Sequence, residues 1–175
     1  VFSRMSRPVT LALELDDTPL STELQGFIDA MVALSGGKLK SVVVDGEYEK
    51  DDMGRSVFDV EHVLPAARPC VRMVVDGKPT GLAFHGVPSG HEFNSFVLGL
   101  YNVAGSGQPL GDDLIERAKS ITDPLSIMIL VSLTCTMCPE TVLASQRIAS
   151  LNPAVRAEAY DVAHFPELRD HYGAM

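Results

Sequence analysis

The chain has 175 residues, of which 46% are hydrophobic and 21% charged, a composition typical of a globular protein with a substantial core. Its net charge of −9, with no basic stripe, disfavours binding to nucleic acid or to an anionic membrane surface. Its apolar runs are short, whereas a transmembrane helix needs about 20 residues, and the N-terminus lacks a hydrophobic signal region. We therefore expect no nucleic acid and no membrane as partners, and a cytoplasmic location.

Two of the three cysteines stand close together. The chain has three cysteines: Cys70, Cys135 and Cys138. Three are too few for the disulfide framework of a secreted protein, and an odd number cannot all be paired within one chain. A reducing compartment suits them better, and there a close pair is more often catalytic or metal-binding than structural. The stretch SLTCTMCPE, which holds Cys135 and Cys138, is therefore the first candidate for a functional site.

The first part of the chain has the pattern of a strand, a helix and a second strand. Apolar residues alternate with others over 9–15, which predicts a half-buried strand. Apolar residues at helical spacing follow, with Ser21 as the expected N-cap, until a Gly-Gly pair. A second strand is expected over 39–44, and the charged stretch 45–56 is interpreted as a loop or a short irregular helix.

A hairpin and a helix come next. The pattern predicts strands over 70–75 and 81–84 around an Asp-Gly turn, and then a helix over 90–103. A strand, helix and strand followed by an antiparallel hairpin and a helix is the order of elements in thioredoxin. Pro69 precedes the first hairpin strand, where that fold has a cis-proline, and Cys70 is then expected to be a buried strand thiol.

A small, flexible stretch, AGSGQP, divides the chain. We expect one module over 1–104, a linker over 105–109 and a second module over 110–175. The continuous apolar run in the second module predicts a strand that is buried on both faces. The elements expected there, alternately helix and strand, cover 112–121, 125–133, 138–151, 155–160 and 165–172. We predict an α/β chain of two tandem thioredoxin-like modules, of which the second is truncated before its hairpin.

The cysteine pair lies between a predicted strand and a predicted helix. Cys135 stands just before the helix, where free backbone N–H groups and the helix dipole favour a thiolate. It is therefore the expected attacking sulfur, and Cys138, one turn further on, is the expected resolving thiol. Two alternatives stay open: a zinc site with His164 and His171, whose spacing is unusual for zinc, and a pair of inert core thiols.

Several stretches together resemble one family. SLTCTMCPETV, ASLNP, GVPSGHEFNSFVLGL and the N-terminal LELDD are similar, in this order, to the N-terminal domain of AhpF, the flavoprotein of the alkyl hydroperoxide reductase system that reduces the peroxiredoxin AhpC. The resemblance implies two fused thioredoxin-like folds, of which only the second keeps a redox disulfide, here Cys135 and Cys138. It also implies that Glu92 is an acidic residue placed near that pair. From the residues alone, Glu92 would be a first-turn carboxylate that interacts with the helix dipole.

The resemblance further implies a disulfide oxidoreductase that receives electrons from an FAD- and NAD(P)H-binding reductase portion in cis and passes them to an AhpC-like peroxiredoxin. The chain has no Gly-rich dinucleotide fingerprint, so we expect it to bind no cofactor itself. A homodimer is left open.

The residues between the two cysteines differ from those of the family: this chain has Thr136 and Met137 where the family carries His and Asn. A free glutaredoxin-like oxidoreductase and a redox-inactive scaffold are the alternative functions, and His62, His85 and His91 receive no role.

Overall fold

The computed structural model describes residues 1–44 and 67–174. The loop expected over 45–56, and His62, lie outside the described residues. The described elements are a short 3-10 helix (Phe2–Arg4), six strands and five α-helices. In chain order they are β1 (Val9–Glu14), α1 (Pro19–Leu34), β2 (Leu39–Val43), β3 (Cys70–Val75), β4 (Lys78–His85), α2 (Glu92–Ala104), α3 (Asp112–Lys119), β5 (Leu125–Val131), α4 (Cys138–Leu151), β6 (Val155–Asp161) and α5 (Pro166–Tyr172).

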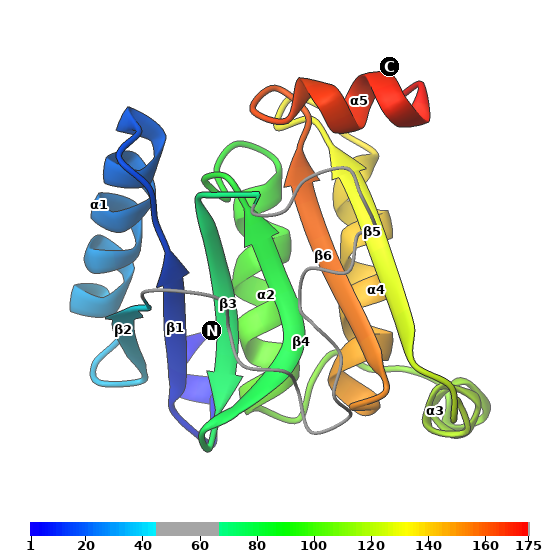
Figure 1. Cartoon of the computed structure of the whole chain (residues 1–175). Helices are drawn as coiled ribbons and strands as arrows, with labels where there is room; N and C mark the ends of the chain where they lie inside the picture. Colours follow the sequence, from blue (N-terminus) through cyan, green and yellow to red (C-terminus); the bar gives the residue numbers. More distant parts are fainter. Residues whose placement is uncertain (45–66, 175) are drawn as a thin grey trace.

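The six described strands form one mixed sheet in the order β2-β1-β3-β4-β6-β5 (Figure 1). β3 is antiparallel to both of its neighbours, β1 and β4, while the pairs β1–β2, β4–β6 and β5–β6 are parallel. The parallel pairing of β4 with β6 joins the first half of the chain to the second. Both halves therefore share one sheet.

The main hydrophobic core lies between the sheet and the helices α1, α2 and α4. Alternate strand residues face it, for example Leu11 of β1, Met73 of β3 and Phe84 of β4. Because side chains alternate across a strand, the residues between them point to the opposite face. That opposite face carries a set of buried charged side chains: Glu14, Arg72, His85 and Glu158.

The start of α1 corrects the predicted N-cap. Thr18, not Ser21, caps the helix: its Oγ1 accepts a hydrogen bond from the Ser21 N–H at 3.4 Å. Ser21 lies inside the first turn and donates from Oγ to Asp16 Oδ1 at 2.6 Å. The helix begins earlier than expected because Pro19 occupies its first position, where proline loses no hydrogen bond.

Strand β5 is less buried than its sequence predicted. Among the described strands it lies at an edge of the sheet and pairs with β6 alone, so the expectation of burial on both faces is wrong. Ile129 and Val131 are buried, whereas the side chain of Leu125 is 41% exposed. Strand β6, whose sequence alternates in polarity, lies instead between β4 and β5 and is buried along its whole length.

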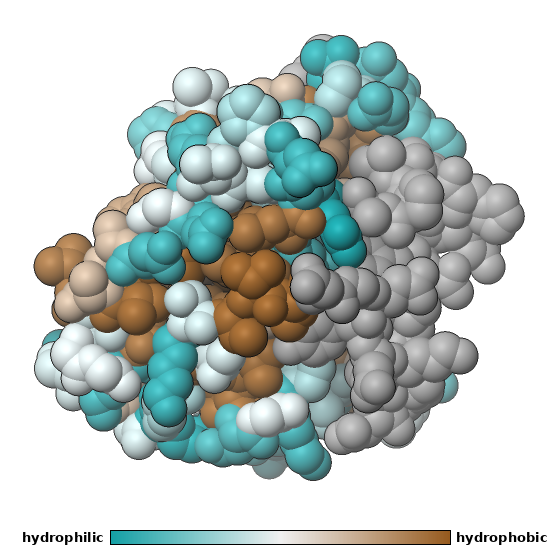
Figure 2. Space-filling model, turned by 60° about the vertical axis from the view of Figure 1, so that its left-hand side comes forward, coloured by the Kyte–Doolittle hydropathy of each residue, from teal (hydrophilic) through white to brown (hydrophobic). Residues whose placement is uncertain are grey.

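The other edge of the sheet is β2. Figure 2 shows the side of the molecule that carries α1 and β2, with apolar surface between polar regions. The exposed large apolar side chains on these two elements are Leu34, Val42 and Val43.

Two further predictions are confirmed. The peptide bond between Arg68 and Pro69 is cis, and Cys70 is a buried free thiol in the first position of β3. None of the described helices has the length and apolar character needed to cross a bilayer.

Candidate active site

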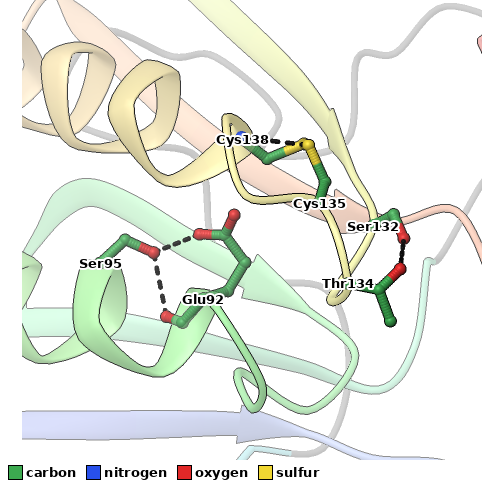
Figure 3. Close-up of a disulfide and its surroundings, with 6 residues drawn as sticks. All are labelled: Glu92, Ser95, Ser132, Thr134, Cys135 and Cys138. Atoms are coloured by element: carbon green, nitrogen blue, oxygen red, sulfur yellow. Dashed lines mark hydrogen bonds between the residues drawn. A yellow bond between two sulfur atoms is a disulfide. The ribbon is translucent and has the colours of Figure 1, made fainter.

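The cysteine pair lies between the end of β5 and the first turn of α4 (Figure 3). Cys135 belongs to the connecting loop, and its N–H donates to the Ser132 carbonyl at 2.9 Å. Cys138 is the first residue of α4, and a disulfide joins the two sulfurs, with 5.6 Å between the Cα atoms. Pro139 lies in the first helical turn, where its missing N–H removes no hydrogen bond.

The two sulfurs have different surroundings. Cys138 packs against the main hydrophobic core, whereas Cys135 lies outside the set of residues that pack against this core. The Cys138 N–H, the first of α4, donates to Cys135 Sγ at 3.2 Å. A hydrogen bond from a helix N-terminus stabilises a thiolate more than a thiol. The geometry thus favours Cys135 as the sulfur that carries the negative charge when the disulfide is reduced.

The start of α2 contacts the loop that precedes Cys135. The His91 N–H donates to the Leu133 carbonyl at 3.0 Å. Gly90 makes this approach possible: its φ is +55°, and a Cβ atom there would lie 2.6 Å from the Leu133 oxygen. Any other residue at position 90 would clash with the loop and strain the backbone.

This contact brings Glu92 close to the disulfide. Glu92 is the first residue of α2, and its side chain is wholly buried. Figure 3 shows its carboxyl group on the side of α2 that faces the Cys135–Cys138 loop. Farther along, α2 and α4 pack closely, since a Cβ at Gly99 would lie 2.8 Å from Gln146 Oε1. The structure therefore places all three predicted site residues together.

Burial determines the ionisation of Glu92. It raises the pKa of the carboxyl group, and the contacts with Ser95 and the charge of His91 offset the rise only in part. Ser95 Oγ contacts Glu92 Oε2, while Oε1 is buried and has no hydrogen-bond partner in the part of the chain that the structure describes. A carboxyl group in this setting keeps its proton to a higher pH than an exposed carboxyl group does, which suits a group that accepts and returns a proton.

The surface around the disulfide is open to a partner. Thr134 and Thr136 are exposed, and Met137, between the cysteines, is 66% exposed. The disulfide is therefore presented on an exposed loop with one large apolar side chain. This arrangement suits exchange with a disulfide of another protein or domain.

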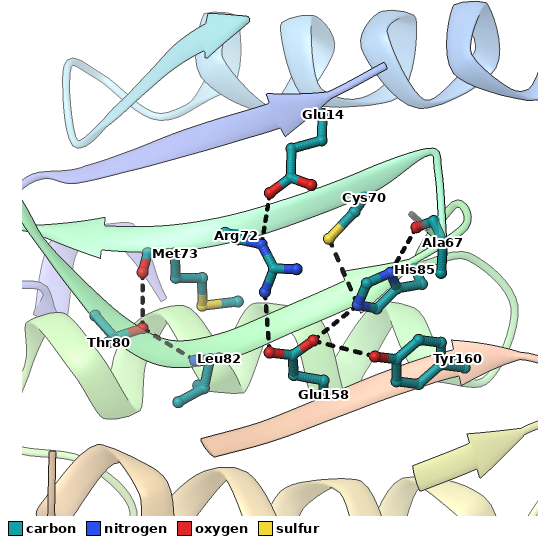
Figure 4. A network of polar contacts seen from close by, with 10 residues as sticks. All are labelled: Glu14, Ala67, Cys70, Arg72, Met73, Thr80, Leu82, His85, Glu158 and Tyr160. Carbon is teal, nitrogen blue, oxygen red and sulfur yellow. Dashed lines mark hydrogen bonds and ion pairs between the residues drawn. The ribbon is translucent and has the colours of Figure 1, made fainter. Parts of the chain in front are cut away.

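A second cluster was missed by the sequence prediction (Figure 4). Arg72 Nε binds Glu14 Oε1 at 2.6 Å and its Nη1 binds Glu158 Oε1 at 3.0 Å. His85 Nε2 lies 2.9 Å from Glu158 Oε2, and Tyr160 donates to the same oxygen at 3.2 Å. This buried network connects β1, β3, β4 and β6, so it links the two halves of the sheet.

His85, to which the sequence analysis assigns no role, lies at the centre of this network. Its Nδ1 lies 2.7 Å from the Ala67 carbonyl, which can only accept, and Nε2 faces the Glu158 carboxylate. Both nitrogens therefore donate, as in an imidazolium ion. Burial alone lowers the pKa of His85, but Cys70 and Glu158 outweigh it and raise the pKa to about 9. Burial alone raises the pKa of Glu158, but Arg72, His85 and Arg156 outweigh it and lower the pKa to about 2.

The described part of the chain contains no group of three or more His, Cys, Asp or Glu side chains that could hold a metal ion.

Similar sequences and similar solved structures come from the same family of proteins. The N-terminal domain of alkyl hydroperoxide reductase AhpF from Enterococcus faecalis is 38% identical, with a TM-score of 0.84 over 99% of this chain and 81% of that one. The chain belongs to the AhpF family of alkyl hydroperoxide reductases. AhpF of Pseudomonas aeruginosa is 33% identical over 164 residues, which are 94% of this chain and 28% of the relative. The corresponding protein of Staphylococcus epidermidis is 37% identical over 152 residues, which are 87% of this chain and 30% of the relative.

The chain spans less than a third of the length of these curated relatives. No family model matches it. A protein disulfide oxidoreductase from Aeropyrum pernix has the same fold, with a TM-score of 0.72 at 24% identity. The AhpF relatives identify the chain as a domain of the AhpF family, and the Aeropyrum pernix structure shows the shared fold.

Proposed function

We propose that this chain is the thiol–disulfide electron-transfer domain of an AhpF-type alkyl hydroperoxide reductase. It accepts electrons from an FAD- and NAD(P)H-binding reductase portion in cis and passes them to an AhpC-like peroxiredoxin, which reduces peroxides. The observation that carries this proposal is the disulfide at the start of α4, in which the Cys138 N–H donates to Cys135 Sγ and Glu92 lies buried beside it.

The reaction is a pair of thiol–disulfide exchanges. In the reduced domain, the Cys135 thiolate attacks a disulfide sulfur of the partner, a mixed disulfide forms, and the partner's other sulfur leaves as a thiolate. Cys138 then attacks Cys135 Sγ, the mixed disulfide breaks, and the second partner thiolate leaves. Two electrons have moved to the partner, and the proton of Cys138 passes to Glu92.

Flavin and nicotinamide chemistry belong to another part of the parent protein. FAD would supply hydride-derived electrons to the Cys135–Cys138 disulfide. The sequence of this domain has no Gly-rich dinucleotide fingerprint, so we assign the flavin site to the reductase portion. The residues of this domain receive, hold and pass on the electron pair.

The arrangement of elements supports two tandem modules. β1, α1, β2, β3, β4 and α2 have the complete thioredoxin order, and β5, α4 and β6 repeat its strand–helix–strand beginning. In the first module the position of the cysteines is taken by Asp16, Asp17 and Thr18, at the start of α1, which cannot form a disulfide. We infer that the first module contributes Glu92 and the sheet on which the second module is built.

Exchange rates with defined partners test this function. The reduced domain should reduce an oxidised AhpC-like peroxiredoxin much faster than it reduces glutathione mixed disulfides. Cys135→Ser should abolish the reaction, and Cys70→Ser, at a buried cysteine outside the loop, is the matched control and should leave it intact. Equal activity on glutathione substrates would indicate a glutaredoxin-like oxidoreductase instead. Unchanged exchange in Cys135→Ser would leave only a scaffold role.

A further inference from the structure

The Ser95 hydroxyl contacts two oxygens of Glu92, and its one hydrogen cannot be donated to both at the same time. Ser95 lies one turn after Glu92 on α2, and it is equally buried. Its Oγ lies 2.9 Å from the Glu92 backbone oxygen and also contacts Glu92 Oε2. A serine hydroxyl has a single hydrogen to donate but can also accept. The direction of the bond to Oε2 therefore depends on whether Glu92 carries a proton.

Both protonation states of Glu92 fit this geometry. When Glu92 is ionised, Ser95 donates to Oε2. When Glu92 is protonated, Oε2–H donates to Ser95 Oγ, and the serine hydrogen turns to the Glu92 backbone oxygen, a common acceptor for serine in helices. The carboxyl group does not have to move between the two states. Its other oxygen, Oε1, keeps its place on the side of the Cys135–Cys138 loop (Figure 3).

We propose that Ser95 is a positioning residue for the dithiol reaction: it holds Glu92 Oε2 in both protonation states, so that Oε1 stays directed at the Cys135–Cys138 pair. This inference rests on the proposed function. When Cys138 attacks Cys135 Sγ, its proton passes to the Glu92 carboxylate, and the electron pair of the broken mixed disulfide leaves with the partner's sulfur. When the disulfide is next reduced, Glu92 returns the proton to Cys138.

Within residues 1–44 and 67–174, three other titratable groups lie near Glu92. They are His91, the exposed residue just before α2, and the two cysteines of the pair, Cys135 and Cys138. Phe27 of α1 contacts Phe96, and both Met73 of β3 and Gln146 of α4 lie against Gly99, so these neighbours are not titratable. In this setting the Ser95 hydroxyl is the main polar contact of the carboxyl group among the described residues.

The titration of Glu92 in the oxidised protein tests the proposal directly. It is followed by carbon-13 NMR of the side-chain carboxyl, assigned with Glu92→Gln. Ser95→Ala should raise the midpoint by roughly half to one pH unit, because the ionised form loses a charge-assisted bond and the neutral form loses a weaker one. Ser95→Thr, which keeps the hydroxyl, should restore the wild-type midpoint. Ser145→Ala, at a buried serine of α4, is the matched control and should not change it.

A second readout links Ser95 to the chemistry. The pH profile of disulfide exchange by the reduced domain should shift in Ser95→Ala by the same amount as the Glu92 midpoint. In the Glu92→Gln background, Ser95→Ala should cause no further shift. A purely structural serine would lower the melting temperature of Ser95→Ala and leave the Glu92 midpoint and the pH profile where they are, which would overturn the proposal.

The two proposals fail in different ways. If Cys135→Ser still exchanges disulfides, the proposed function is wrong, whatever the Glu92 titration shows. If Cys135→Ser is inactive but Ser95→Ala leaves the Glu92 midpoint unchanged, the function stands and the role of Ser95 is wrong.

Discussion

The buried ion pair between His85 and Glu158 should make the stability of this domain depend on pH in the alkaline range. The folded state raises the pKa of His85 from 6.5 to about 9. The resulting stabilisation is fully present below pH 6.5 and is lost as the pH rises through 9, where the folded protein releases the proton. Glu158, whose pKa is held at about 2, remains ionised over this whole interval.

The magnitude follows from the size of the shift. A difference of about 2.5 pH units, at ~1.36 kcal/mol for each unit, gives up to about 3 kcal/mol. This is a large part of the roughly 5–15 kcal/mol that is typical of a folded domain. Burial raises the pKa of Tyr160, so this neighbour stays neutral and does not contribute in the same range.

Urea unfolding at intervals from about pH 6 to about pH 10, with a reductant to prevent exchange with Cys70, measures this effect. The free energy of unfolding should fall by up to about 3 kcal/mol over the range. Glu158→Gln removes the negative partner of His85 and should flatten the fall, while His171→Gln, at an exposed histidine of α5, should retain it. A wild-type stability that is constant over this range, or an equal fall in Glu158→Gln, would refute the reasoning.

Three substitutions probe other parts of the structure. Arg72→Ala should destabilise the domain by about 3–5 kcal/mol in thermal unfolding, because it removes the buried cation that pairs with both Glu14 and Glu158; a loss below about 1 kcal/mol would contradict this. Gly90→Ala should slow disulfide exchange and lower the melting temperature, since its Cβ would displace the Leu133 carbonyl; an unchanged exchange rate would show that the α2 contact does not position the loop. Asp16→Ala should cost about 1 kcal/mol of unfolding free energy by removing the acceptor of Thr18 N and Ser21 Oγ, and a neutral effect would contradict its role at the start of α1.

The elements around the cysteine pair could be predicted from the sequence because their signals are local. The apolar run that ends at Val131 and the Cys-Pro start of α4 identify the strand and the helix, and their order along the chain indicates a thioredoxin-like fold. The position of Glu92 near the cysteine pair is predicted only by the resemblance to the family. Its place near the pair depends on packing between α2 and the loop, about 40 residues away in sequence, which no local pattern encodes.

What the sequence did not reveal depends on the order of strands in the sheet. The alternation of Arg156 and Glu158 with alanines looks like a half-exposed strand, yet β6 lies between two other strands and is buried on both faces. The apolar run of β5 looks like a central strand but lies at an edge. Strand order is determined by long-range pairing, so it also determines that His85 meets Glu158, 73 residues further along the chain.

Chemical trapping of the attacking sulfur tests the central claim most directly. Cys135→Ser and Cys138→Ser, each reduced, are mixed with an oxidised AhpC-like peroxiredoxin, and the products are identified by mass spectrometry. The structure predicts that Cys138→Ser accumulates a mixed disulfide through Cys135, because the Cys138 position supplies the N–H that stabilises the Cys135 thiolate. Cys135→Ser should form little or none. A mixed disulfide that forms mainly through Cys138, or no mixed disulfide in either variant, would contradict the account.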